Sequence, residues 1–353
     1  MTGYERIIKA VRRERADRLP IDYTTTPEAH AMLKRHLAID DDEQLLQRIG
    51  CDVRRVDGRY VGPADMTGEP GIRAAGKDFW GIIRKPVRNE FGTYYEFDYH
   101  PLAHVTTVAE VEEYDWPSLD WFDFGHLSTD IDRLNRDGRY CIVYLAGSTF
   151  ETPWYMRGMS RFLMDLIEYP DIAEAISRRV TDFYRQRTMR AIEQSGGKID
   201  LILSGSDIGT QRGMMLAPDQ WRRYLKSYTA ELISPFKKMG LLTMYHSCGS
   251  ILPVIEDFIG MGLDILDPIQ PAAAGMDPAS LAEQFGDRLT FHGGIDEQHL
   301  LPHGTPDEVR AEVTRTMEIL GRKGGYIVAP AHAIQPDTPP ENIVALYDTV
   351  QGR

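Results

Sequence analysis

Two residues of types that often bind soft metal ions lie two positions apart in the stretch "LLTMYHSCGS", where an apolar run ends. They are His246 and Cys248. Because alternate residues of a strand point to the same side, an imidazole and a thiol at this spacing can face one ligand together. Zn²⁺ accepts nitrogen and sulfur ligands, and a catalytic zinc ion needs about three protein ligands. The pair predicts part of a zinc site, although a buried free cysteine beside a hydrogen-bonded histidine would give the same sequence.

A third metal ligand has to come from another part of the chain. We expect it to be His332, which follows the apolar run of "GYIVAPA". His292, in "LTFHGG", competes for this place, but the two glycines behind it indicate a close approach of the backbone. We therefore assign His292 to substrate binding.

Polar residues also follow several other apolar runs. Asp207 and Gln211, in "LILSGSDIGTQRG", are the expected catalytic residues. Asp207 would act as a general acid or orient the substrate, while Gln211 and Gln335 would bind its polar end through hydrogen bonds. Asp207 before Gly-Thr is also typical of a residue that caps a turn, so a purely structural role for Asp207 stays open.

An aromatic stretch, "STFETPWYMRGMSRFLMDL", follows another apolar run. Trp154, Tyr155 and Met156 would line an apolar pocket for a methylated or aromatic substrate. Packing of a helix against the rest of the fold is the alternative for this stretch.

The order of the elements predicts an α/β fold, a (β/α)8 TIM barrel formed by one domain over residues 1–353. Short apolar runs alternate with longer amphipathic segments, and the expected strands are 18–24, 51–57, 140–147, 199–205, 241–247, 263–269, 289–294 and 325–331. Parallel barrels carry their active sites at the carboxyl ends of the strands, which would bring the polar residues together. Thr305 to Glu308 and Thr338 to Glu341 both predict capping boxes at the starts of helices.

Residues 76–108 interrupt this order with an aromatic, β-branched stretch that predicts a β-hairpin-like insertion. Its aromatic residues would cover the mouth of the barrel or bury an interface in a homodimer. Those in question are Phe79, Trp80, Phe91, Tyr94 and Tyr95.

The composition excludes several classes of protein. The 353 residues carry a formal net charge of −13, which disfavours nucleic acid and anionic membranes as partners. Three widely spaced cysteines do not predict a disulfide framework. Because the sequence has no apolar run long enough for a signal peptide or a membrane span, we expect a cytoplasmic protein.

Four stretches resemble the uroporphyrinogen decarboxylase superfamily and, within it, the branch of cobalamin-dependent methyltransferases. They lie between residues 206 and 348 and read "SDIGTQRG", "YHSCGSILPVIEDFIGMGLDILDPIQP", "FHGGID" and "GGYIVAPAHAIQPDTPPENIVALYD". The resemblance implies a TIM barrel and a zinc site built from a His-x-Cys pair and a distant cysteine. The pair matches His246 and Cys248, but no cysteine follows Cys248, and His332 lies where the distant cysteine is expected.

The resemblance implies that the chain moves a methyl group between a small O-, N- or S-methyl substrate and a corrinoid (cobalamin) on a partner protein. The chain itself lacks the Asp-x-His-x-x-Gly signature of a corrinoid-binding module. It also lacks, in "LPIDYTTTPEAHAMLKRH", the arginine-rich stretch with which uroporphyrinogen decarboxylases bind a tetrapyrrole. This disfavours porphyrinogen decarboxylation.

Two other functions stay open. One is a metal-dependent lyase or decarboxylase of a small organic acid on the same barrel, in which Arg212 would bind the carboxylate of the substrate. The other is a non-catalytic homologue that binds a metabolite or a corrinoid. Release of carbon dioxide would indicate the first, and ligand binding without turnover the second.

Overall fold

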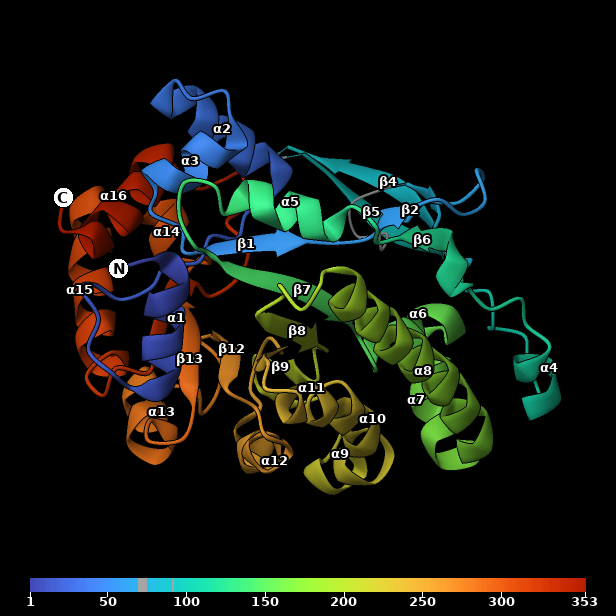
Figure 1. Cartoon of the computed structure of the whole chain (residues 1–353). Coiled ribbons are helices and arrows are strands. Elements are labelled where there is room, and N and C mark those ends of the chain that lie inside the picture. Colours follow the sequence, from blue (N-terminus) through green and yellow to red (C-terminus); the bar gives the residue numbers. More distant parts are fainter. Residues whose placement is uncertain (69–74, 91) are drawn as a thin grey trace.

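The computed structural model describes residues 1–68, 75–90 and 92–353. Its main element is a curled parallel sheet with helices on its outer face (Figure 1). The strands follow one another in the order β1 (Val53–Val56), β7 (Cys141–Gly147), β8 (Leu201–Gly205), β11 (Leu242–His246), β12 (Ile265–Ile269), β13 (Thr290–Ile295) and β14 (Tyr326–Pro330). Each of these strands lies within, or one residue beyond, a run that was expected to be a strand.

The remaining position of the sheet is filled by residues 20–25, between β14 and β1. Ile21 forms a parallel bridge with Val328 of β14, and its carbonyl accepts a hydrogen bond of 2.8 Å from the N–H of Asp52, just before β1. The segment therefore joins the two edges of the seven-stranded sheet. The fold is a TIM barrel, as predicted, and the weakly apolar first run supplies the contact that closes it.

The helices cover the outside of the barrel. They are α1 (Gly3–Arg12), α2 (Pro27–Leu37), α3 (Asp42–Arg48), α4 (Val108–Glu112), α5 (Leu127–Leu134), α6 (Glu151–Arg157), α7 (Met159–Glu168), α8 (Pro170–Gln194), α9 (Pro218–Tyr224), α10 (Lys226–Glu231), α11 (Ser234–Lys238), α12 (Ile255–Met261), α13 (Pro278–Phe285), α14 (Leu300–His303), α15 (Pro306–Leu320) and α16 (Pro340–Gln351). The small strands outside the main sheet and the insertion are β2 (Arg59–Tyr60), β6 (Phe122–Asp123), β9 (Gly209–Thr210) and β10 (Gly213–Met214).

One of the two predicted capping boxes is confirmed. At α15, the side chain of Thr305 accepts the N–H of Glu308, and the Glu308 carboxylate accepts the N–H of Thr305. At α16 the prediction is wrong, because Pro340 rather than Pro339 is the first helical residue. Thr338 then stands one position too early for its side chain to cap the helix.

The insertion predicted at 76–108 contains a three-stranded antiparallel sheet of β3 (Gly76–Lys77), β4 (Ile83–Asn89) and β5 (Gly92–Tyr99). Its hairpin, β4–β5, is confirmed, and Phe91 lies outside the described residues. Phe79 and Trp80 do not cover the barrel mouth but are buried in a core against α8, where the indole of Trp80 donates a hydrogen bond of 3.2 Å to Tyr184. This anchors the insertion to the barrel.

Alternation along β7 separates the two faces of the barrel wall. Ile142, Tyr144 and Ala146 are buried in the same core as residues of α8, so they face outward. Residues 141, 143 and 145 therefore face the barrel interior, since successive side chains of a strand point to opposite sides.

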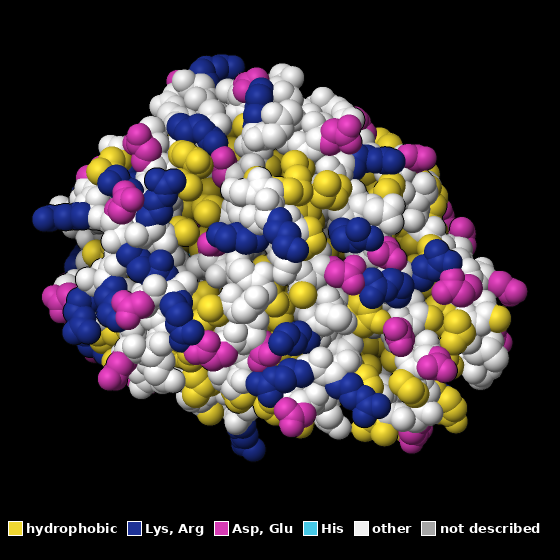
Figure 2. Space-filling model, turned by 60° about the horizontal axis from the view of Figure 1, so that its bottom comes forward, with side chains coloured by type: hydrophobic (Ala, Val, Ile, Leu, Met, Phe, Trp, Pro, Cys, Tyr) yellow, Lys and Arg dark blue, Asp and Glu magenta, His cyan; other side chains and the backbone are white. Residues whose placement is uncertain are grey.

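Two properties of the structure bear on the expected partners. In the part of the chain that the structure describes, no helix is both long and apolar enough to cross a membrane. On the face shown in Figure 2, basic and acidic side chains are interspersed, and no continuous basic surface is visible there.

The organisation as one domain stays a prediction, and unfolding can test it. Trp80→Ala removes a fully buried side chain that joins the insertion to α8, so it should lower the free energy of unfolding by about 3–5 kcal/mol. The unfolding curve measured by circular dichroism should stay a single transition. The matched control is Tyr94→Ala in the same insertion, where the side chain is exposed and little change is expected. Two separate transitions would contradict a single domain.

Candidate metal site and its buried charge chain

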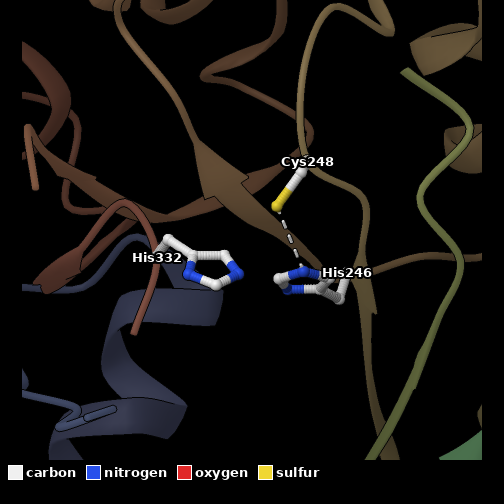
Figure 3. Close-up of side chains that lie close together, drawn as sticks. All are labelled: His246, Cys248 and His332. Carbon is white, nitrogen blue, oxygen red and sulfur yellow. Dashed lines mark hydrogen bonds between the residues drawn. The ribbon is translucent and has the colours of Figure 1, made fainter. Parts of the chain in front are cut away.

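The three predicted metal ligands converge at the carboxyl ends of the barrel strands. His246 is the last residue of β11, Cys248 follows two residues later, and His332 lies just beyond β14. Their ligand atoms all lie within 4.8 Å of one another. Cys248 Sγ is 3.5 Å from His246 Nε2, and the ring of His332 faces that of His246 (Figure 3). Residues more than 80 positions apart in the sequence thus form one cluster.

The backbone holds the His246–Cys248 turn in place. Gly205 of β8 pairs with His246, and a Cβ atom on Gly205 would lie 2.7 Å from the Cβ of His246, so only glycine fits there. The N–H of Cys248 donates a hydrogen bond of 2.8 Å to Asp207 Oδ1. The N–H of Gly249 donates one of 2.6 Å to Gln270 Oε1. Polar residues after β8 and β12 therefore orient the ligand turn.

Asp267 fixes the ring of His246. Its Oδ2 accepts a hydrogen bond of 2.6 Å from His246 Nδ1, which leaves Nε2 directed toward Cys248. A carboxylate that holds one ring nitrogen while the other faces the metal is the common arrangement around metal-binding histidines. Asp267 lies inside β12 and is not among the site residues expected from the sequence, and its role follows from the pairing of β11 with β12.

His292 does not have the predicted role in substrate binding. Its ring is 3% exposed, Nδ1 is 2.6 Å from Asp267 Oδ1, and Nε2 is 3.1 Å from Asp22 Oδ2. Asp22 in turn accepts two hydrogen bonds from Arg55. His292 therefore lies below the site, inside a chain of alternating charges that runs from Arg55 through Asp22, His292 and Asp267 to His246.

This chain of alternating charges sets the protonation states of its members. Burial would lower the pKa of His292, but Asp267 and Asp22 outweigh it and raise the pKa to about 9. Burial also opposes the ionisation of Asp267, yet His292 and His246 lower its pKa. In the same way, Asp267 raises the pKa of His246 against the effect of burial. At neutral pH, His292 is an imidazolium that donates to two carboxylates.

The residues of the cluster fit a zinc ion. Burial and the neighbouring His246 lower the pKa of His332, so its ring is neutral and offers a lone pair. Burial raises the pKa of the Cys248 thiol, while His246 opposes that rise. Once His246 and Cys248 have released their protons, two imidazoles and one thiolate form a donor set that zinc accepts, with one position left for a substrate.

Glu151 belongs to the same site and was missed in the sequence. It begins α6, just after β7, and its carboxylate accepts a hydrogen bond of 2.9 Å from Ser148. Burial and the negative charge of Asp207 raise its pKa to about 7. The sequence signal for Glu151 is the polar stretch "GSTFE" after an apolar run. In this region, sequence analysis considered only the aromatic residues and Met156 as site residues.

The other predicted residues are distributed around the mouth. Asp207 lies next to the ligands, with Oδ1 3.6 Å from His246 Nε2, whereas Gln211 and Arg212 are exposed on the turn between β9 and β10. Gln335 lines an open hollow that it shares with His332. Their catalytic and substrate-binding roles stay predictions.

The predicted apolar contacts are partly corrected. Met156 is fully buried in the core beneath α8, so it packs within the fold and does not reach a substrate. Trp154 and Tyr155 are partly exposed and contact Phe97 of the insertion, with ring centroids 5.4 and 4.8 Å away. Tyr155 also lies near Glu151, 3.5 Å from its carboxylate. These two rings join the insertion to the rim of the site.

Known proteins resemble this chain in sequence and in fold. The model of the family described as uroporphyrinogen decarboxylase (URO-D) matches residues 96–353. A uroporphyrinogen decarboxylase of Thermus thermophilus is 26% identical over 227 residues, which are 62% of this chain and 61% of that protein. That of Pseudoalteromonas translucida is 24% identical over 287 residues, 77% of each chain. The match thus spans about three fifths of the length of the Thermus relative.

The solved structure of a methyltransferase from Methanosarcina mazei superposes on the whole chain. The TM-score is 0.70 and the sequence identity 20%, and the match covers 100% of this chain and 99% of the other. At this identity, the likeness establishes a common fold.

The charge of His292 predicts a dependence of stability on pH. Because its pKa is raised to about 9 in the folded protein, it contributes stability that is fully present below the ordinary value near 6.5. This contribution, about 3 kcal/mol, is lost as the pH rises through about 9. In chemical denaturation between pH 6 and 10, His292→Gln should weaken the loss of stability on the alkaline side. An unchanged pH dependence in the variant would show that His292 is neutral.

Proposed function

The chain belongs to the uroporphyrinogen decarboxylase family, and we propose that it is a zinc-dependent methyltransferase. It moves a methyl group between a small O-, N- or S-methyl substrate and a corrinoid (cobalamin) carried by a partner protein. The observation that carries the proposal is the cluster of His246, Cys248 and His332 at the barrel mouth. The methyltransferase with the same fold supports the choice among the activities known on this barrel.

In this proposal His246, Cys248 and His332 hold the zinc ion. A bound zinc ion supplies Lewis acidity to the heteroatom that carries the methyl group. His332 takes the place of a second thiolate, because no cysteine follows Cys248 in the sequence. Asp267 keeps the ring of His246 in orientation, and Asp207 and Gln270 keep the turn that presents Cys248.

Glu151 exchanges the proton that methyl transfer requires. When the methyl group leaves without its bonding electrons, the heteroatom keeps the electron pair and takes a proton from the Glu151 carboxyl group, which becomes a carboxylate. In the reverse direction the carboxylate takes this proton back. A carboxyl group with a pKa near 7 serves both directions at neutral pH.

A decarboxylase or lyase of a small organic acid is the second candidate. The names of the curated relatives favour it, since they are uroporphyrinogen decarboxylases. Zinc bound at the cluster together with methyl transfer would exclude it, whereas release of carbon dioxide from a carboxylic acid would establish it. Binding of a corrinoid or metabolite without any turnover would indicate the third candidate, a non-catalytic homologue.

We further propose that the protein acts in the cytoplasm. Its cysteines are free thiols, and the thiolate of Cys248 has to stay reduced to bind a metal ion. A homodimer stays an expectation, which size-exclusion chromatography with light scattering can examine.

Metal content is the first test of the proposed function. The protein purified without chelator should contain about one zinc ion per chain by elemental mass spectrometry. Cys248→Ala and His332→Ala should both lose it, while His303→Ala, at the end of α14 and outside the cluster, should keep it. If zinc is lost with Cys248→Ala but kept with His332→Ala, His332 is not a ligand. No zinc in the wild type, even after zinc is supplied, would refute the mechanism.

The role of Glu151 predicts a specific pH profile. With a methylated substrate and free cob(I)alamin as the acceptor, the rate of demethylation should fall as the pH rises through about 7, because the acid form of Glu151 is lost. Glu151→Gln should lower the rate by about 10²–10⁴ and abolish this step in the profile. The control is Glu96→Gln, an exposed glutamate of β5. A step that persists in Glu151→Gln would assign the proton to another group.

A further inference from the structure

Arg55 places a cation inside the barrel. Its neighbour Arg54 is buried and pairs with Glu43 of α3, on the outside of the barrel wall. Because side chains alternate along β1, Arg55 faces the interior, where it contacts Asp22 with N–O distances of 2.5 and 2.9 Å. Its side chain is nevertheless 42% exposed. An inward-facing side chain with this exposure borders a space that solvent reaches from the barrel mouth.

Leu145 borders the interior in the same way. It belongs to the set of β7 residues that face inward, and it is 47% exposed. Leu145 belongs to β7, which lies next to β1, and Arg55 of β1 pairs with Val143 of β7. Four polar residues also lie in the upper part of the interior, namely Asp22, His246, Asp267 and His292. The space therefore has an apolar wall next to a cationic one.

The insertion hairpin lies along this part of the rim. At one end, Phe97 packs on Tyr155 of α6. At the other end, Gly92 lies beside Glu28 of α2, and Glu90 shares a hollow with Pro336. Helix α2 follows residues 20–25, and α6 follows β7, so the hairpin spans the side of the barrel where β1 ends. The hairpin therefore lies beside the space next to Arg55.

Arg55 retains hydrogen-bond donors that its ion pair does not use. A guanidinium has five N–H donors, and Asp22 accepts two hydrogen bonds from it. Asp22 is 3% exposed and also accepts a hydrogen bond from the His292 imidazolium, so its charge is shared between two cations. The accessible side of Arg55 can therefore bind a second carboxylate, for which the planar guanidinium is well shaped.

We propose that Arg55 is the residue that recognises the substrate, and that the substrate is a small methylated carboxylate whose apolar part lies against Leu145. This inference rests on the methyl-transfer function proposed above. It assigns to Arg55 the carboxylate contact that Arg212 would make in the lyase alternative, and Arg212 lies on the exposed turn between β9 and β10. The methylated end of such a substrate would extend toward His246, at the other end of the charge chain.

Binding of matched ligand pairs tests this inference without requiring turnover. The probes are 4-methoxybenzoate with 4-methoxybenzyl alcohol, and methoxyacetate with 2-methoxyethanol, titrated calorimetrically into zinc-loaded and metal-free protein. At least one carboxylate should bind more tightly than its alcohol. Arg55→Gln should weaken the binding of that carboxylate at least about tenfold and leave that of the alcohol unchanged. Arg315→Gln, an exposed arginine on α15, is the matched control and should bind both members of the pair like the wild type, while Arg212→Gln tests the competing assignment.

Arg55→Lys keeps a cation next to Asp22 and decides the question if Arg55→Gln does not fold. It should bind the carboxylate more weakly than the wild type, because lysine lacks the planar fork. Equal affinity for both members of each pair, no binding of either carboxylate to the wild type, or a loss in Arg212→Gln instead of Arg55→Gln would overturn the inference. Carboxylate binding that depends on Arg55, in a protein that binds no zinc and transfers no methyl group, would refute the proposed function and leave the role of Arg55 standing.

Discussion

A single buried carboxylate, Asp267, accepts hydrogen bonds of 2.6 Å from two imidazoles at once. One of them, His246, is a candidate metal ligand, and the other, His292, is a buried cation. A charge in a protein interior is tolerated only when opposite charges and hydrogen bonds compensate it, and removal of one partner costs several kcal/mol. The position of His246 therefore depends on a chain of compensated charges that extends to Asp22 and Arg55. The candidate metal site is the exposed end of that chain of charges.

Closure of the barrel makes this chain possible. Asp22 belongs to the first strand position and His292 to β13, yet the bridge between Ile21 and Val328 brings the two ends of the sheet together. The interior of an eight-stranded barrel is just filled by side chains, so inward-facing residues of different strands must contact one another. Here the upper layer of that interior contains the charge chain beside the apolar Leu145, and buried apolar residues such as Val143 lie below it. This arrangement accounts for a reactive site on top of a stable scaffold.

The mouth of the barrel combines different chemical environments within one ring of strand ends. His246, Cys248 and His332 offer soft ligands, Glu151 offers a proton near neutral pH, and Arg55 offers a positive charge beside apolar Leu145. The aromatic contacts between Phe97 and α6 hold the insertion next to this ring. A small molecule with a heteroatom, an apolar part and an anionic end matches the three environments together.

Sequence alone predicted the fold class and the three members of the candidate metal cluster. Both follow from local patterns, namely the alternation of apolar runs with helices and the positions of His246, Cys248 and His332 after strand-like runs. The tertiary structure decided what surrounds them. It buried Met156 in the core and His292 between two carboxylates, and it revealed Asp267, Glu151 and Arg55 as parts of the site. These assignments depend on strand register, on burial and on the charges of neighbouring strands, which a linear sequence does not contain.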